Sequence, residues 1–211
     1  MSIDLEAKLR GKREETKANN RQAIIDAARL VFAELGYGAT TVRDIIRATD
    51  LASGTFYNYF KSKEEAFQAL QDETALRVRP RLRAERIRAR NFEEFISGSF
   101  RTFFDFVKND QTTFATMRRN PDMQRVRIDT PEVIAGFDEL RADLEVAIEN
   151  GVVPATDPDL LMAAMVGVAF EVAHQMLTRP DVSVDDAAKF ATALFLGGVH
   201  ALPKKSVGKK R

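Results

Sequence analysis

The sequence predicts an all-α protein built from a small N-terminal domain of three short helices and a larger C-terminal helical domain. Three observations lead to this class. Apolar residues recur at helical spacing in almost every segment. No stretch of useful length alternates apolar and polar residues as a strand does. The breaks between segments fall at residues that favour turns, chiefly Gly, Pro, Asn and Asp.

The N-terminal elements begin with a helix that carries Ile24, Val31 and Leu35 and ends at Gly36, a typical C-cap. A second short helix follows Thr41, because a Thr three residues before Asp44 has the spacing of a capping box. A third short helix is predicted over residues 52–59.

A fourth helix should open at a second capping box, formed by Ser62 and Glu65. Pro80 should kink or end this helix. Seven Arg lie between residues 77 and 90. We interpret this stretch as a solvated helix and connection, with a phosphate-contacting surface as the alternative.

Five longer helical patterns follow, at roughly 92–108, 110–119, 131–150, 157–178 and 184–200, with turn signals such as NP and GVVP between them. Aromatic content drops and Arg content rises where the two domains should meet. The expected organisation is a flexible basic arm over 1–18, the three-helix domain over 19–79, the larger domain over 80–203 and a basic tail over 204–211.

Charge and composition restrict the class of protein. The net charge of +1 conceals +3 over residues 1–63, +2 over 64–92, −9 over 93–203 and +5 over 204–211. This pattern favours basic ends near a polyanion, although an acidic solvated surface with basic termini would look the same. The chain has no Cys, which excludes disulfides and thiolate metal sites. No apolar run approaches the roughly 20 residues that span a bilayer, and the N-terminus has no signal-peptide core, so we expect a cytoplasmic protein without membrane contact.

Two short helices joined by a tight turn, TTVRDIIRATDLASGTFYNYF, have the layout of a helix-turn-helix whose second helix enters a major groove. Phe56 and Phe60 are four residues apart and should share the core face. The side chains left outward carry hydroxyls, an amide and cations, which suit base edges and phosphates: Ser53, Thr55, Tyr57, Asn58, Tyr59, Lys61 and Lys63, with Gly54 allowing close backbone approach. For Tyr57 and Tyr59 a core position with only the hydroxyl outward remains open.

At this point residues 21–70, RQAIIDAARLVFAELGYGATTVRDIIRATDLASGTFYNYFKSKEEAFQAL, resemble the TetR family of one-component repressors. The elements AA..VF...GY..TTV..I, GTFYNYF and KSKEEAF stand in that family's order and spacing, over about a quarter of the chain. The resemblance implies a homodimer on a pseudo-palindromic double-stranded DNA operator, with a C-terminal domain that binds a small-molecule effector. Asp50 replaces a frequent Gly, and Ala52 replaces a frequent Ser, whose capping role would pass to Ser53.

The resemblance extends the expected DNA contacts to Thr41 and Arg43. Asn58 is the best candidate for reading a base, because an amide pairs bidentately with adenine. Cations of the arm either follow the DNA backbone or minor groove, or belong to an ordinary disordered segment: Lys8, Arg10, Lys12, Arg13, Lys17 and Arg21.

The C-terminal helices near 157–178 and 184–200 are rich in Ala and Gly, which allow close helix approach. We expect them to form the homodimer interface, the alternative being packing within one chain. Aromatic residues of the preceding helices should be mainly core. An apolar effector pocket, for an acyl-chain or aromatic ligand, is expected among Phe103, Met117, Arg118, Phe137, Met165, Phe170 and His174.

Catalysis is rejected at the level of sequence. Glu171 and His174 form the E-x-x-H spacing of di-iron sites, but position 197, three before His200, is Gly, so a second such motif is missing. No nucleophile elbow, phosphate-binding Gly loop or zinc ligand set occurs. We expect no enzyme, metal or cofactor, but a ligand-responsive transcriptional repressor that the effector releases from DNA. The alternative is a helical protein-interaction scaffold with only secondary DNA binding.

Overall fold

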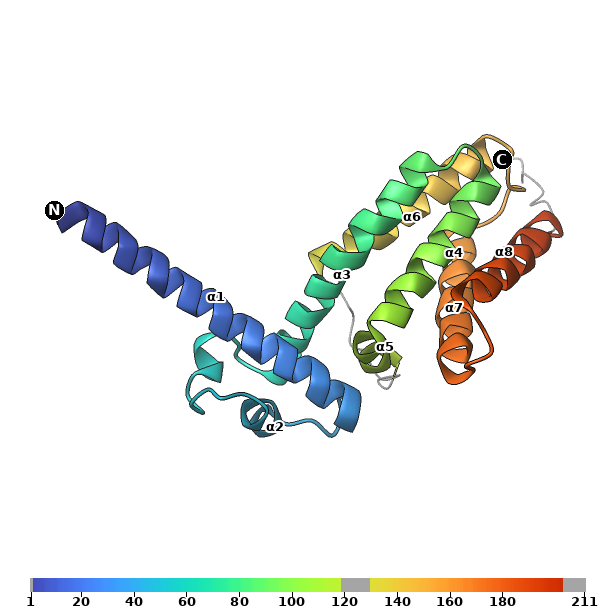
Figure 1. Ribbon diagram of the computed structural model, residues 1–211. Coiled ribbons are helices and arrows are strands. Elements are labelled where there is room, and N and C mark those ends of the chain that lie inside the picture. The colour runs from blue at the N-terminus through green and yellow to red at the C-terminus, as the bar shows by residue number, and fades with distance from the viewer. Residues whose placement is uncertain (1, 119–129, 203–211) are drawn as a thin grey trace, which may run out of the picture. The chain divides into compact units, whose positions relative to one another are not determined.

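A computed structural model describes residues 2–118 and 130–202, with only the backbone described for residues 2–10, 117 and 118. This part of the chain is helical and contains no strand, as predicted (Figure 1). The α-helices are α1 (Ser2–Leu35), α2 (Val42–Arg47), α3 (Lys63–Arg88), α4 (Phe92–Asn109), α5 (Gln111–Arg118), α6 (Pro131–Glu149), α7 (Pro158–Thr178) and α8 (Val184–His200). The five C-terminal helices begin and end within two residues of their predicted bounds.

Two compact units share this chain. The first, which we call the head, comprises Met1–Thr74 with Thr112–Thr130, and the second, the body, comprises Ala75–Gln111 with Pro131–Arg211. The units therefore divide within α3 at residue 74 instead of residue 79. Residues from Thr112 group with the head and not with the body. Thr116 is fully buried there, and its hydroxyl lies 3.2 Å from the Arg29 carbonyl and 3.0 Å from the Thr112 carbonyl.

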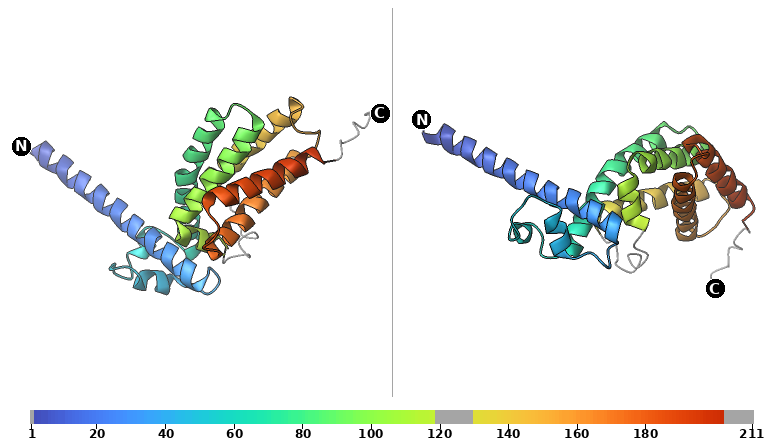
Figure 2. Two further views of the ribbon diagram at one scale, coloured as in Figure 1. Left: turned by 45° about the vertical axis from the view of Figure 1, so that its right-hand side comes forward. Right: turned by 60° about the horizontal axis from the view of Figure 1, so that its bottom comes forward.

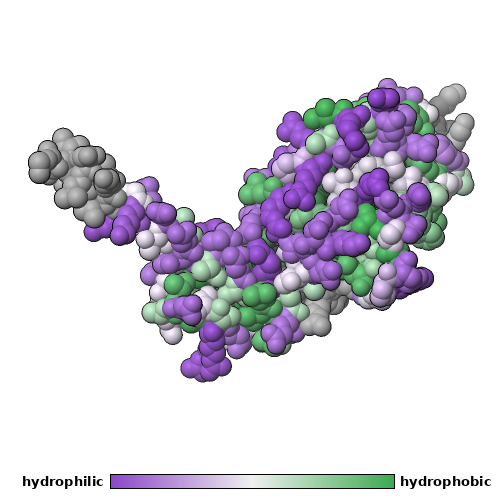
Figure 3. Space-filling model, in the orientation of Figure 1, coloured by the Kyte–Doolittle hydropathy of each residue, from purple (hydrophilic) through white to green (hydrophobic). Residues whose placement is uncertain are grey.

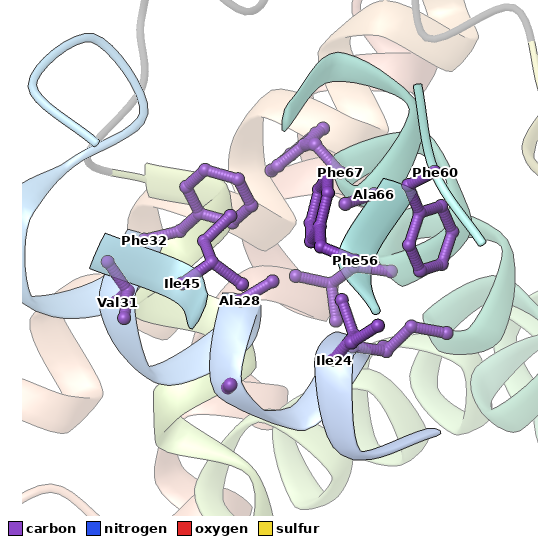
Figure 4. Close-up of a cluster of buried hydrophobic side chains, with 12 residues drawn as sticks. Ile24, Ala28, Val31, Phe32, Ile45, Phe56, Phe60, Ala66 and Phe67 are labelled. Atoms are coloured by element: carbon purple, nitrogen blue, oxygen red, sulfur yellow. The ribbon is translucent and has the colours of Figure 1, made fainter. Parts of the chain in front are cut away.

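The head is organised around a core of aromatic and branched side chains (Figure 4). Helix α1 contributes Ile24 and Phe32, α2 contributes Ile45, and the predicted core residues Phe56 and Phe60 are both buried. Phe32 also meets Phe67 of α3 edge to face, with ring centroids 5.2 Å apart. Burial of such side chains contributes about 1.5–3 kcal/mol each, so this cluster is what holds the short elements of the head in place.

The predicted helix over residues 52–59 is wrong in type. The segment forms a turn closed by the Thr55 amide on the Ala52 carbonyl (2.8 Å), followed by the single 3-10 turn η1 (Phe56–Asn58). The first i→i−4 bond of the segment runs from Phe60 to Phe56. Ser53 and Gly54 explain the difference, because Gly is a poor helix former and Ser favours local turns over helix.

The arm departs from expectation, and of the two outcomes expected at Pro80, a kink or an end of the helix, the end is wrong. Helix α1 continues through residues 2–18, where a flexible arm was predicted, because these residues are rich in strong helix formers such as Leu, Ala, Lys, Arg and Glu. Helix α3 passes through Pro80 and ends only at Arg88. The predicted C-cap Gly36 is confirmed, with a φ of 79° that favours glycine.

In the body, α8 packs on α4 and α7, and α6 packs on α7 (Figure 2). Phe100 of α4 stacks on Phe104 and meets Phe195 of α8 edge to face. These aromatic residues are buried, which confirms that the phenylalanines of this region are mainly core.

The arginine-rich stretch is mainly a solvated helix and connection, as the first interpretation held, since five of its seven arginines are exposed: Arg77, Arg81, Arg83, Arg88 and Arg90. The two half-buried arginines, Arg79 and Arg86, pair with acidic groups of the body. Arg79 contacts Glu132 at 2.8 Å and Glu139 at 2.5 Å, and Arg86 contacts Glu139 and, at 2.9 Å, Asp143. The hydrogen bond from Arg79, followed by the bond and charge of Arg86, lowers the pKa of Glu139. Helix α3 is thereby tied to α6 by a ladder of ion pairs.

Candidate functional site

The first element of the candidate DNA surface, α2, is held by the predicted capping box. The Asp44 amide donates to the Thr41 hydroxyl (3.3 Å), and the Thr41 amide donates to the Asp44 carboxylate (2.9 Å). The Thr41 hydroxyl also donates to that carboxylate at 2.6 Å, and these bonds lower the pKa of Asp44. Ile45 of α2 is buried in the head core, whereas Thr41 and Arg43 are exposed.

The segment after α2 separates core and surface residues sharply. Tyr57 is 61% exposed although its ring lies edge-on to buried Phe56, so a core position for Tyr57 is wrong. Tyr59 is half-buried and packs against the head core, as its alternative interpretation held. Ser53, Gly54 and Asn58 are exposed, and Thr55 is half-buried.

The two lysines that follow have different environments. Lys61 is exposed, and its amide donates to the Glu65 carboxylate at 2.6 Å, a bond that the predicted capping box had assigned to Ser62. The Ser62 hydroxyl accepts from the Glu65 amide, as expected.

Lys63, predicted to contact phosphate, instead donates within the head. Its ammonium bonds the carbonyls of Tyr37 and Thr40, both at 2.8 Å, and that of Gly38 at 3.4 Å. It also lies over the Tyr37 ring, 4.7 Å from the centroid. An ammonium has three donors, and all three point at the loop between α1 and α2. Lys63 therefore shapes the loop that leads into α2.

Polar contacts also fix α1 against α3 behind this surface. Arg29 of α1 binds Glu73 of α3 at 2.6 Å, and Gln22 donates to the same carboxylate at 2.9 Å. Arg21 places its guanidinium over the Phe60 ring, 5.2 Å from the centroid. The elements that carry the exposed residues thus rest on a braced scaffold.

Sequence reasoning overlooked Arg47, which is exposed in the last turn of α2. Its spacing of four from Arg43 puts both cations on one face of the helix, and this spacing was the available signal. Together the exposed hydroxyls, the Asn58 amide and the cations at 43, 47 and 61 provide hydrogen-bonding groups for base edges and positive charge for phosphates.

Of the predicted effector residues, Phe103 of α4 and Phe170 of α7 are in contact, with ring centroids 5.4 Å apart. Met165 is buried, His174 is half-buried and Phe137 on α6 is exposed. The side chains of Met117 and Arg118 lie outside the described residues. Among the described side chains of this set, Phe103 and Phe170 are the two aromatic rings that meet, and the effector site stays a prediction.

Two surface hollows in the body lie elsewhere. One, of about 830 Å³, is lined by the C-terminal end of α3, by α4 and by α8, and it holds charges of both signs, including Arg101, Lys189 and Asp185. The other, of about 250 Å³, lies between the α3–α4 connection and α6, beside Phe92 and Val152. Neither is lined by a predicted effector residue.

The small residues of α7 and α8 divide into two groups. Ala173, Ala187, Ala188 and Ala191 are buried within the chain, as the alternative held. Ala163, Ala164, Gly167 and Gly198 are exposed. Large apolar neighbours are exposed as well: Leu160 (70%), Phe190 (61%) and Leu194 (53%).

Helix α7 is more apolar than expected, since an 18-residue window has a mean hydropathy of 1.6 and is only 22% buried within the chain. By length and composition alone this helix is long and apolar enough to span a membrane, contrary to the expectation that no apolar run approaches that length. Two polar residues interrupt the apolar sequence of this helix: Glu171, which is exposed, and His174, which is half-buried. Within residues 2–118 and 130–202, no three His, Asp or Glu side chains gather as metal ligands would.

Comparison with known proteins agrees with the geometry of the head. Residues 24–70 match the family model described as bacterial regulatory proteins, tetR family. The chain is 23% identical over 152 residues to the HTH-type transcriptional regulator YhgD of Bacillus subtilis, covering 70% of this chain and 78% of that protein.

Solved structures share the fold over most of the chain. The fatty acid degradation regulator FadR from Bacillus halodurans is 25% identical, with a TM-score of 0.72 and coverage of 85% of this chain and 96% of that one. FadR from Bacillus subtilis in complex with stearoyl-CoA is 24% identical, with a TM-score of 0.70 and coverage of 85% and 99%. With its matching head and a helical body of the same fold, this chain belongs to the TetR family of transcriptional regulators.

Proposed function

We propose that this regulator is a homodimeric repressor that binds a pseudo-palindromic operator and is released by a largely apolar effector. The observation that carries the DNA-binding part is the separation within residues 53–60. Phe56 and Phe60 are buried, while Tyr57 and Asn58 are exposed, as are the cations Arg43 on α2 and Lys61 directly after the segment. A surface of this composition can follow a major groove, reading bases through Asn58 and holding phosphates through the cations.

We assign base and backbone contacts to Thr41, Arg43, Ser53, Gly54, Thr55, Tyr57, Asn58, Tyr59 and Lys61, and we add Arg47. Lys63 is omitted because its donors already serve the α1–α2 loop. The half-buried Thr55 and Tyr59 take part through their hydroxyls.

The dimer is proposed to form through the exposed faces of α7 and α8. Leu160, Phe190 and Leu194 would lose water there, and the exposed Ala163 and Gly167 let a second helix approach closely. Exposed large apolar side chains that gather into a patch mark an interaction site on a protein surface. The same burial accounts for the hydropathy of α7 without a membrane.

The effector site is proposed between α4 and α7 around Phe103 and Phe170. Both rings are only partly buried, so an acyl chain or aromatic ring that separates them would gain apolar contact. Met165 and His174 lie within two turns of Phe170 on α7, and Phe137, Met117 and Arg118 remain proposed further contacts. The stearoyl-CoA complex of the Bacillus subtilis relative supports an acyl chain as the first ligand to test.

Release would follow if the effector favours a spacing of the two recognition segments other than the roughly 34–36 Å that operator half-sites require. The loss of DNA affinity then equals the difference in effector binding between the two states. No part of this mechanism needs catalysis, a metal or a cofactor, and it places the protein in the cytoplasm with its DNA.

Fluorescence anisotropy with a duplex from the DNA beside the gene tests this function. For the wild type, affinity should fall by about 10³-fold or more between 50 and 200 mM salt if a dimer makes six or more phosphate contacts. Asn58→Ala should weaken binding to this duplex more than to an unrelated one. A protein-interaction scaffold would show neither effect, and equal losses on both duplexes would refute base reading by Asn58.

A further inference from the structure

Helix α1 is much longer than the head core requires. Its contribution to that core starts at Ile24, whereas the helix begins at Ser2. The side chains of residues 11–19 are exposed, and the described part of this extension is mostly hydrophilic in Figure 3. Figure 1 shows the extension projecting beyond α2 and the rest of the head. Two turns or more of exposed helix contribute little to the head core, so their charges indicate what they are for.

One face of this extension is basic. Arg13, Lys17 and Arg21 follow each other at intervals of four, and the core residues Ile24 and Ala28 follow at intervals of three and four. At about 100° per residue, the three cations and the two core residues occupy one sector of roughly 80° on the helix. Glu14 lies at the edge of this sector, and Lys12 lies about 140° around the helix from Lys17.

The contact between Arg21 and Phe60 shows where the basic face of α1 lies relative to the candidate DNA surface. Arg21 lies over the ring of Phe60, 5.2 Å from the centroid, and Phe60 ends the segment that carries Tyr57 and Asn58. Lys61, exposed, comes next in the chain. The basic face of α1 therefore continues, without a break in the helix, from the edge of the candidate DNA surface.

We infer that this extension is a rigid helical arm that lies along the sugar–phosphate backbone of the bound duplex. From Arg13 to Arg21 the cations span about 12 Å at 1.5 Å per residue. Phosphates of one strand rise about 3.4 Å per step, so the arm reaches several of them. The contacts carry no sequence information and add affinity and register only. This inference rests on the proposed DNA binding, which it extends beyond the helix-turn-helix.

The test compares two variants that each remove one exposed lysine charge from the same helix, Lys17→Gln on the basic face and Lys12→Gln off it. Affinity for the duplex is measured by anisotropy between 50 and 200 mM salt. Loss of one phosphate contact lowers the steepness of the plot of log affinity against log salt by about 0.9. For each bound head, the loss of affinity of Lys17→Gln between 50 and 200 mM salt should therefore be about 3.5-fold smaller than that of the wild type. Lys12→Gln should match the wild type.

For the double variant Arg13→Gln/Lys17→Gln, the loss of affinity over the same salt range should be about tenfold smaller than that of the wild type for each bound head. Circular dichroism checks that all variants keep the wild-type helix content. If Lys17→Gln, Lys12→Gln and the wild type show equal slopes of log affinity against log salt, the phosphate contacts of the helical arm are refuted, while the proposed DNA binding of the head still stands. A wild type without salt-dependent DNA binding would instead refute the proposed function itself.

Discussion

Replacing Lys63 by Met separates a structural role of this residue from a DNA-binding one. Met keeps the length and apolar stem of the side chain but has no donor. The carbonyls of Tyr37 and Thr40, each 2.8 Å from the ammonium, would lose their charged partner, and the ring of Tyr37 would lose a cation 4.7 Å from its centroid. The loop that leads into α2 would then be held less firmly.

The magnitude follows from these contacts. A hydrogen bond to a charged group contributes about 1.5–3 kcal/mol when shielded from water. The site is only half-buried, so water can replace part of each bond, and we expect a loss of about 2 kcal/mol for the two together. For a chain of this size that corresponds to a fall of about 4–8 °C in Tm.

Urea unfolding followed by circular dichroism measures this loss, with Lys61→Met as the matched control. Lys61 is exposed, so its removal should leave the unfolding midpoint unchanged while weakening DNA binding. An unchanged midpoint for Lys63→Met, together with a loss of DNA affinity as large as that of Lys61→Met, would refute the structural role of Lys63.

Three further predictions concern other parts of the chain. Phe56→Ala should destabilise the head by about 3–5 kcal/mol in urea unfolding, because the ring is 1% exposed and its removal leaves a cavity; a cost below about 1 kcal/mol would contradict its place in the core. Phe190→Asp should convert the proposed dimer to a monomer in sedimentation velocity, whereas Ile87→Asp, at a still more exposed apolar position on α3 (78% against 61%), should not. Glu139, whose pKa is lowered first by its bond to Arg79, adds stability above its ordinary pKa of 4.5 that is lost as pH falls through the lowered value. Glu139→Gln should therefore show a shallower fall in unfolding free energy below pH 4.5 than the wild type, and parallel curves would refute the pairing.

The sequence by itself determined the features of this protein that depend on neighbours a few residues away. The bounds of α4 to α8, the box of Thr41 with Asp44 and the cap at Gly36 all follow from helical periodicity and local hydrogen bonding. The spaced pattern of residues 21–70 also identified the head, since its core positions recur at fixed intervals.

Tertiary structure alone decided the contacts between groups far apart in the chain. Lys63 bonds carbonyls 23 to 26 residues before it, and Arg86 pairs with Glu139, 53 residues later; neither partner leaves a local signal. Only packing could divide the alanines of α7 and α8 between a buried and an exposed side, because small residues suit both. Local pattern thus determines where helices form, whereas the charges and faces that the helices expose depend on which segments the fold brings together.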